Sequence, residues 1–167
     1  RTEYSFTLID GESGVVLDLH WRLKGRYGSC YLALGEMEER LRRTPFGGGE
    51  VLQLPCEELV LYLCLHGTKN RWPDLDSICC LAEQLRSSGD LDWHYLFHRA
   101  ERLHCRRALH LGLFLARDLL QTELPEGVLA ALRKDAAVQK LASKVERSLF
   151  HGTLHPGRNG IYGTHYF

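Results

Sequence analysis

The sequence predicts an α+β fold that is predominantly α, with an N-terminal β-hairpin followed by a bundle of about five or six helices. Three observations support this prediction. Apolar and polar residues alternate in two short segments near the N-terminus, which is the period of a strand. A glycine-containing turn separates these segments. Beyond residue 55, apolar residues recur every three or four positions, which is the period of an amphipathic helix.

The composition is that of an ordinary globular domain: 167 residues, 44% hydrophobic and 25% charged. Lys plus Arg and Asp plus Glu both total 21, so the charge balance gives no clear nucleic-acid signature. No apolar run reaches the roughly 18 residues that a membrane span needs, and no signal-peptide pattern opens the chain. We therefore expect a cytoplasmic protein without membrane partners.

The cysteines point to a reducing environment and to no metal site. None of the six forms a Cys-x-x-Cys pair, and several fall on apolar helical faces, which is typical of reduced thiols in a core. His94 and His98 lie four residues apart on a predicted helix, but no third ligand follows at a suitable distance. We expect no zinc, haem or flavin. The six are Cys30, Cys56, Cys64, Cys79, Cys80 and Cys105.

The hairpin is predicted from strands at residues 4–9 and 15–21, joined by the turn at residues 10–14. Because side chains alternate along a strand, Asp18 and His20 share one face of the second strand, and its apolar residues share the other. A carboxylate on an apolar strand needs water, a hydrogen bond, a cation or a metal to compensate it. Asp18 is therefore either a solvated residue of an edge strand or a ligand of a divalent ion.

The segment that follows the hairpin is predicted to connect it to the helices. Residues 22–29 hold two glycines and three cations, as in a solvated connector, and residues 31–43 are predicted to form a short helix. Residues 44–49 contain Pro45 and three glycines, which end that helix. Residues 50–54 are expected to form a brief strand or an extended segment leading into the bundle.

The bundle begins at Pro55, a residue favoured at the first helical position, with two glutamates in the first turn. This first helix is apolar on most sides and is predicted to be the central one. Asp90 or Asp92 is expected to cap the third helix. The domains predicted are 1–54 for the hairpin and connector, 55–150 for the bundle and 151–167 for an irregular tail. Later helices are expected at 73–86, about 90–103, 105–119, about 125–132 and 138–149.

No phosphate-binding glycine loop, dinucleotide fingerprint or serine-hydrolase motif is present. His66, Lys69 and Trp72 instead mark the end of the first helix. A lysine at this position can contact phosphate oxygens as a point charge, or it can simply interact favourably with the helix dipole. The residues alone leave both interpretations open.

Residues 16–23 and 54–72 together resemble the uncharacterised bacterial nucleotidyltransferases. In that family a polymerase-β-like palm with Gly-Ser and Asp-x-Asp motifs precedes a strand that reads Asp-Leu-His-Trp, as residues 18–21 do here. Helices with a His-Gly-x-Lys-x-x-Trp-like motif follow, as at residues 66–72. The resemblance covers about residues 4–120 and identifies the hairpin as the remnant of a palm sheet.

The resemblance implies that Asp18 is the third acidic residue of the palm, catalytic and bound to Mg²⁺. It implies that His66, Lys69 and Trp72 bind the nucleotide, with His20 and Arg22 in support. The intact protein would transfer a nucleoside monophosphate from an NTP to an acceptor that the sequence does not identify. No Gly-Ser and Asp-x-Asp segment precedes the strand of Asp18 in this sequence, so the chain is expected to be the inactive C-terminal portion of such an enzyme.

Two other interpretations remain from the residues. The chain could be a non-enzymatic helical protein-interaction module, with the hairpin pairing at the edge of another sheet. It could also be a metal-binding or redox helical protein, which would require the cysteines to do more than fill the core.

Overall fold

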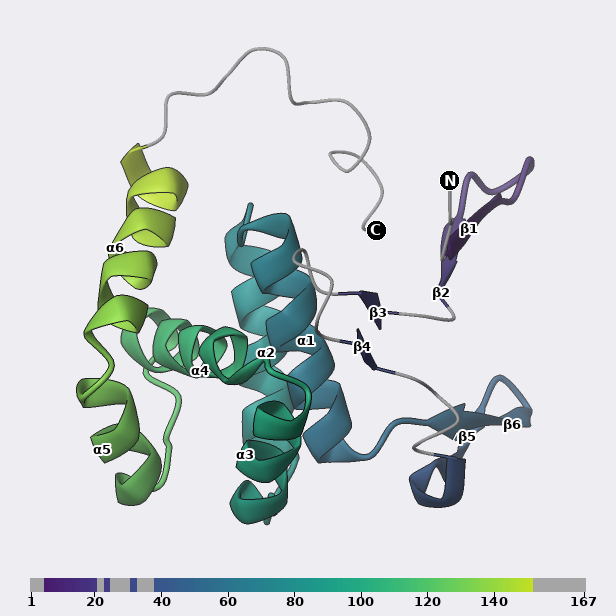
Figure 1. Cartoon of the computed structure of the whole chain (residues 1–167). Coiled ribbons are helices and arrows are strands. Elements are labelled where there is room, and N and C mark those ends of the chain that lie inside the picture. Colours follow the sequence, from purple (N-terminus) through teal and green to yellow (C-terminus); the bar gives the residue numbers. More distant parts are fainter. Residues whose placement is uncertain (1–4, 21–22, 25–30, 33–37, 152–167) are drawn as a thin grey trace.

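The computed structural model describes residues 5–20, 23–24, 31–32 and 38–151. Helices form one side of the molecule and small β-pairs lie on the other side, next to the first helix (Figure 1). This confirms the predicted α+β, mostly helical fold. No helix in the described ranges is long and apolar enough to cross a membrane.

The N-terminal hairpin forms as predicted. Strands β1 (Ser5–Ile9) and β2 (Val16–His20) are antiparallel, with Phe6 opposite Leu19 and Leu8 opposite Leu17. At the turn, the Asp10 N–H donates to the Val15 carbonyl at 2.9 Å. The Asp10 side chain also accepts a hydrogen bond from the Ser13 N–H at 3.0 Å, an Asp-specific turn interaction that explains why this segment reverses the chain here.

Two further antiparallel pairs occur in the described part of the connector. The first joins β3 (Leu23–Lys24) to β4 (Tyr31–Leu32). The second joins β5 (Arg42–Phe46) to β6 (Gly49–Gln53), and it follows a single 3₁₀ turn, η2 (Glu38–Arg40).

The helix predicted at residues 31–43 is therefore wrong. Gly47 and Gly48 both adopt positive φ, at 58° and 84°, and form the two-residue turn of the β5–β6 hairpin. Such a turn matches the twist of paired strands, and Gly-Gly is a recognised signal for it. Cross-strand pairing thus decides the conformation of residues 42–46, and the strand anticipated at 50–54 is observed as β6.

Six helices follow in the described chain, at nearly the positions that the apolar periodicity predicts. Helix α1 is central, because α2, α3 and α4 all pack against it, while α4 also packs against α6. Asp92, one of the two predicted caps, accepts from the Tyr95 N–H at 2.8 Å. The helices are α1 (Cys56–Asn70), α2 (Leu75–Ser87), α3 (Trp93–Arg102), α4 (Arg106–Leu120), α5 (Glu126–Arg133) and α6 (Ala136–His151).

The core is tightest where α4 crosses α1 and α2. Gly112 of α4 faces Cys64 of α1, and a Cβ at Gly112 would lie 2.5 Å from the Cys64 sulfur and 3.0 Å from Leu81 Cδ2. The Cys64 thiol donates a long hydrogen bond, 3.9 Å, to the Leu109 carbonyl. Burial raises the pKa of the Cys64 thiol, which agrees with its prediction as a core cysteine.

Candidate functional site

The face of β2 that carries Asp18 is defined by the register of the hairpin. Asp18 lies opposite Thr7, and His20 lies opposite Ser5. Residues paired across an antiparallel ladder share a face, so these four positions occupy one face of the hairpin. The side chains of Asp18 and His20, and the whole of Arg22, lie outside the described part of the chain, so their predicted roles stay predictions.

The opposite face of the same hairpin is apolar and open. Phe6, Leu8, Leu17 and Leu19 pair with one another across the strands, and each is between 48% and 64% exposed. A contiguous exposed patch of this kind is uncommon on a self-sufficient domain and marks a surface that another element covers.

The motif at residues 66–72 terminates helix α1. Arg71 adopts a left-handed conformation with φ of 66°, and its N–H donates to the Thr68 carbonyl at 3.2 Å. The Trp72 N–H donates to the Gly67 carbonyl at 2.8 Å. These two reversed hydrogen bonds constitute a Schellman motif, which satisfies carbonyls that a helix end otherwise leaves unpaired.

The spacing of Gly67 and Trp72 has a packing cause. The Trp72 side chain folds back over the helix end and is 1% exposed, and a Cβ at Gly67 would lie 2.5 Å from its ring. Only glycine leaves room for the indole at that distance. Trp72, which the resemblance assigns to the nucleotide, therefore lies in the core next to the site rather than on its surface.

His66 and Lys69 remain at the surface of the same helix end. The His66 ring stacks on Tyr62 at 5.7 Å between centroids, and its Nε2 pairs with the Asn70 side-chain amide at 2.8 Å. Lys69 is exposed in the last turn. The structure thus brings His66 and Lys69 to one helix end, with the imidazole fixed by two neighbours and the ammonium free to reach solvent.

A buried polar network connects α1 to α3, and sequence analysis did not predict it. Glu58 is fully buried, and its Oε1 accepts from the Tyr95 hydroxyl and from Arg99 Nε, the latter at 3.2 Å. Burial, followed by the hydrogen bond and the charge of Glu58, raises the pKa of Tyr95, against the opposing effect of Arg40. The phenol therefore stays protonated as a donor to Glu58, and the network joins α1 to α3.

Neighbouring Glu57 contacts both the segment before the bundle and the start of α3. Its Oε1 accepts from the Asp92 N–H at 3.1 Å, and its Oε2 pairs with Arg40 Nη2 at 3.4 Å. The Arg40 guanidinium also lies 3.8 Å above the centre of the Tyr95 ring. Sequence analysis placed Glu57 and Glu58 in the first turn of a helix, where the helix dipole already accounts for a carboxylate. Their positions therefore did not indicate these contacts.

A metal centre is not formed by the side chains that the structure describes: they include no group of three or more His, Cys, Asp or Glu able to hold an ion. His94 and His98 stack on α3 with ring centroids 6.5 Å apart and lack a third ligand among these residues. The five described cysteines are all free thiols, and Cys30 lies outside the described residues.

Comparison with known proteins gives one match. A family model described as "Uncharacterised nucleotidyltransferase" matches residues 1–121. The match covers all the strands and helices α1 to α4, and so includes both Asp18 and the motif at residues 66–72. No curated protein and no solved structure matched the chain.

Proposed function

The chain belongs to the family of uncharacterised nucleotidyltransferases, and from this membership we propose that the intact protein transfers a nucleoside monophosphate from an NTP to an acceptor hydroxyl. The observation that carries the proposal is the extent of the family match. It spans strand β2 and helix α1 without interruption, so the strand carboxylate and the helix-end motif belong to one family unit. In such transfer, catalysis depends on alignment and on stabilisation of charge at the phosphates.

We assign Asp18 as one ligand of a catalytic Mg²⁺. Magnesium prefers oxygen ligands in octahedral geometry, and a carboxylate of the palm strand is a suitable donor. One carboxylate does not make such a site, and the described side chains, which do not include that of Asp18, form no group of three or more possible metal ligands. We propose that the remaining ligands are the carboxylates of the Asp-x-Asp motif that the family resemblance places before the strand of Asp18.

Lys69 is our candidate for the triphosphate contact, with His66 beside it. The ammonium is exposed at the end of α1, and three donors on a flexible stem suit a group that must reach phosphate oxygens. Trp72 supports this position indirectly, because its packing on Gly67 fixes the course of the chain at the helix end. We place His20 on the same strand face as Asp18, and Arg22 two residues further along as an additional cation.

The open apolar face of the β1–β2 hairpin supports its assignment as part of a larger palm. Two strands alone bury too little surface to be stable, so a further layer is required over Phe6, Leu8, Leu17 and Leu19. The second candidate function is a protein-interaction module in which the edge of the hairpin extends the sheet of a partner, and that partner would also cover the exposed apolar face. The two candidates differ in whether substitution of Asp18 affects transfer.

The test is an Asp18→Asn substitution in the intact protein, measured as release of pyrophosphate from NTP in the presence of Mg²⁺. We expect transfer to be abolished and the melting temperature to stay unchanged, because the substitution removes a ligand of the metal and leaves the shape of the side chain. The control is Asp90→Asn, an exposed carboxylate between α2 and α3. Wild-type transfer in the Asp18→Asn protein would exclude the proposed mechanism.

A further inference from the structure

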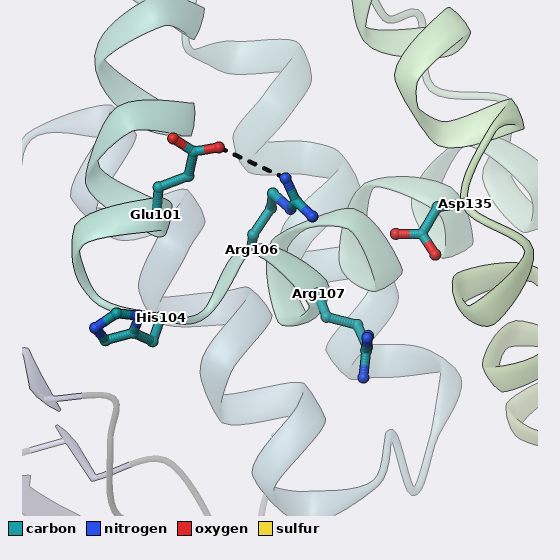
Figure 2. Close-up of a pocket in the computed structure, with 5 residues that line it drawn as sticks. All are labelled: Glu101, His104, Arg106, Arg107 and Asp135. Atoms are coloured by element: carbon teal, nitrogen blue, oxygen red, sulfur yellow. Dashed lines mark ion pairs between the residues drawn. The ribbon is translucent and has the colours of Figure 1, made fainter.

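A pocket of about 430 Å³ lies where the α3–α4 connection meets the α5–α6 turn (Figure 2). Its volume falls within the range of small-molecule sites. None of its residues belongs to the set that we assign to the NTP. Every side chain that lines it is ionisable, and they are Glu101, His104, Arg106, Arg107 and Asp135.

Both carboxylates of the pocket already have partners. Glu101 Oε1 pairs with Arg106 Nη1 at 3.6 Å, the contact drawn in Figure 2. Asp135 accepts from the Val138 N–H at 3.1 Å and pairs with His110 Nδ1 at 3.2 Å. Glu101 is therefore paired with a cation, while Asp135 is held by hydrogen bonds from an N–H and an imidazole.

Arg107 is the second arginine of the pocket, whose lining carries two arginines and two carboxylates. It is exposed on the first turn of α4, and among the described residues it forms no ion pair. Its positive charge contributes to the lowered pKa of Asp135, which lines the same pocket. His104, on the loop before α4, presents a second nitrogen-bearing ring to the same space. The pocket thus includes one guanidinium without an ion pair among the described residues, and an imidazole elsewhere on its lining.

We propose that this pocket binds a phosphate group, with Arg107 as the main contact and His104 and Arg106 around it. A guanidinium donates two parallel hydrogen bonds to phosphate oxygens, which makes Arg the residue most suited to this ligand. The volume accommodates either inorganic phosphate or a small organic phosphate ester. This binding does not depend on Mg²⁺, on NTP or on Asp18, so it stands or fails separately from nucleotidyl transfer.

The experiment is an NMR titration of the ¹⁵N-labelled 167-residue chain with inorganic phosphate and, separately, with ribose 5-phosphate, at constant ionic strength. We expect saturable shifts of the amides of residues 104–107 and 135. Arg107→Gln should weaken binding about tenfold or more, since it removes a charged hydrogen-bond donor. The matched control is Arg117→Gln, an exposed arginine in the last turn of the same helix, which does not line the pocket.

A second variant, His104→Asn, keeps the proposal testable if Arg107→Gln alters the fold. His104 has φ of 52°, and asparagine tolerates this left-handed conformation, so the loop should persist while binding weakens. Tighter binding of ribose 5-phosphate than of inorganic phosphate would identify an organic ester as the ligand class, and equal binding would identify free phosphate. Shifts that do not saturate, equal shifts with acetate, or equal affinity of Arg107→Gln and Arg117→Gln would overturn the proposal.

Discussion

At the residue scale, Glu58 shows how much of this protein's specificity rests on single buried polar groups. Its carboxylate has no exposed surface, and one oxygen, Oε1, receives both Tyr95 and Arg99. A buried ion pair contributes little net stability, because desolvation offsets most of the attraction. Removing one partner is costly, because the other charge is then left in the core. We therefore expect the pair to specify how α1 and α3 meet more than it stabilises the fold.

Asp135 gives a pH-dependent prediction at the same scale. Burial alone would raise its pKa, but the Val138 N–H, His110 and the charge of Arg107 together lower it below 3.8. A carboxyl whose folded pKa lies below its unfolded pKa stabilises the protein above the unfolded pKa, and this stabilisation is lost as the pH falls through the folded pKa.

We therefore expect Asp135→Asn to be less stable than wild type at pH 7 and equally stable once the pH falls below the folded pKa of Asp135. Asparagine can still accept the hydrogen bond from the Val138 N–H, so the difference in stability between the two proteins reports the loss of the negative charge. Urea denaturation at several pH values measures it, with the exposed Asp76→Asn as the control. A difference in stability that stays constant down to the most acidic pH would contradict this assignment.

At the scale of elements, the close approach of α4 to α1 and α2 depends on Gly112. We predict that Gly112→Ala lowers the free energy of unfolding by about 1–3 kcal/mol, because the added methyl group would lie within 3.0 Å of Cys64 Sγ. Helix propensity opposes this loss, since Ala is favoured over Gly by about 1 kcal/mol within a helix.

The control is Gly127→Ala in α5, where an added Cβ meets nothing within 4 Å. This change should leave stability unchanged or raise it by up to about 1 kcal/mol. Chemical denaturation of both variants compares one substitution in two environments. Similar effects at the two positions would mean that α1, α2 and α4 are not packed as described.

The elements also show where local sequence is sufficient. The helices from α1 onward follow from apolar periodicity, because burying one face of a helix requires that spacing whatever its partner. Residues 31–43 were predicted as a helix by the same reasoning, yet their described parts form β4, η2 and the start of β5. The conformation of residues 42–46 depends on pairing with the strand that follows Gly47 and Gly48. The pattern of apolar residues within 31–43 carries no information about that partner strand.

At the scale of the whole molecule, the helical bundle should be independent of the β-pairs. Among the described side chains, the buried hydrophobic core lies within the helices and their connections. Arg40 provides the main described side-chain link between the connector and the bundle, through Glu57 and the Tyr95 ring. We predict that residues 55–151 alone fold cooperatively with native helical content.

Circular dichroism and thermal melting test this prediction. Loss of the Arg40 contacts should cost about 1 kcal/mol, which lowers the melting temperature by about 4–8 °C for a domain of this size. Arg40→Gln in the 167-residue chain should reproduce most of that decrease. A fragment without a cooperative transition would show that the β-pairs are part of the folding unit, contrary to the predicted boundary at residue 55.

The sequence by itself determined the helices of the bundle, the first hairpin, a cap of α3 at Asp90 or Asp92 and the family resemblance, because each depends on residues close together in the chain. Only the tertiary structure decided that Trp72 lies in the core against Gly67, that Glu58 pairs with Arg99, and that Arg107 and Asp135 border one pocket. These relationships join segments through packing, and the distance between two such side chains depends on how whole helices cross. A residue pattern records which face of a helix is buried, but not which polar group it meets there.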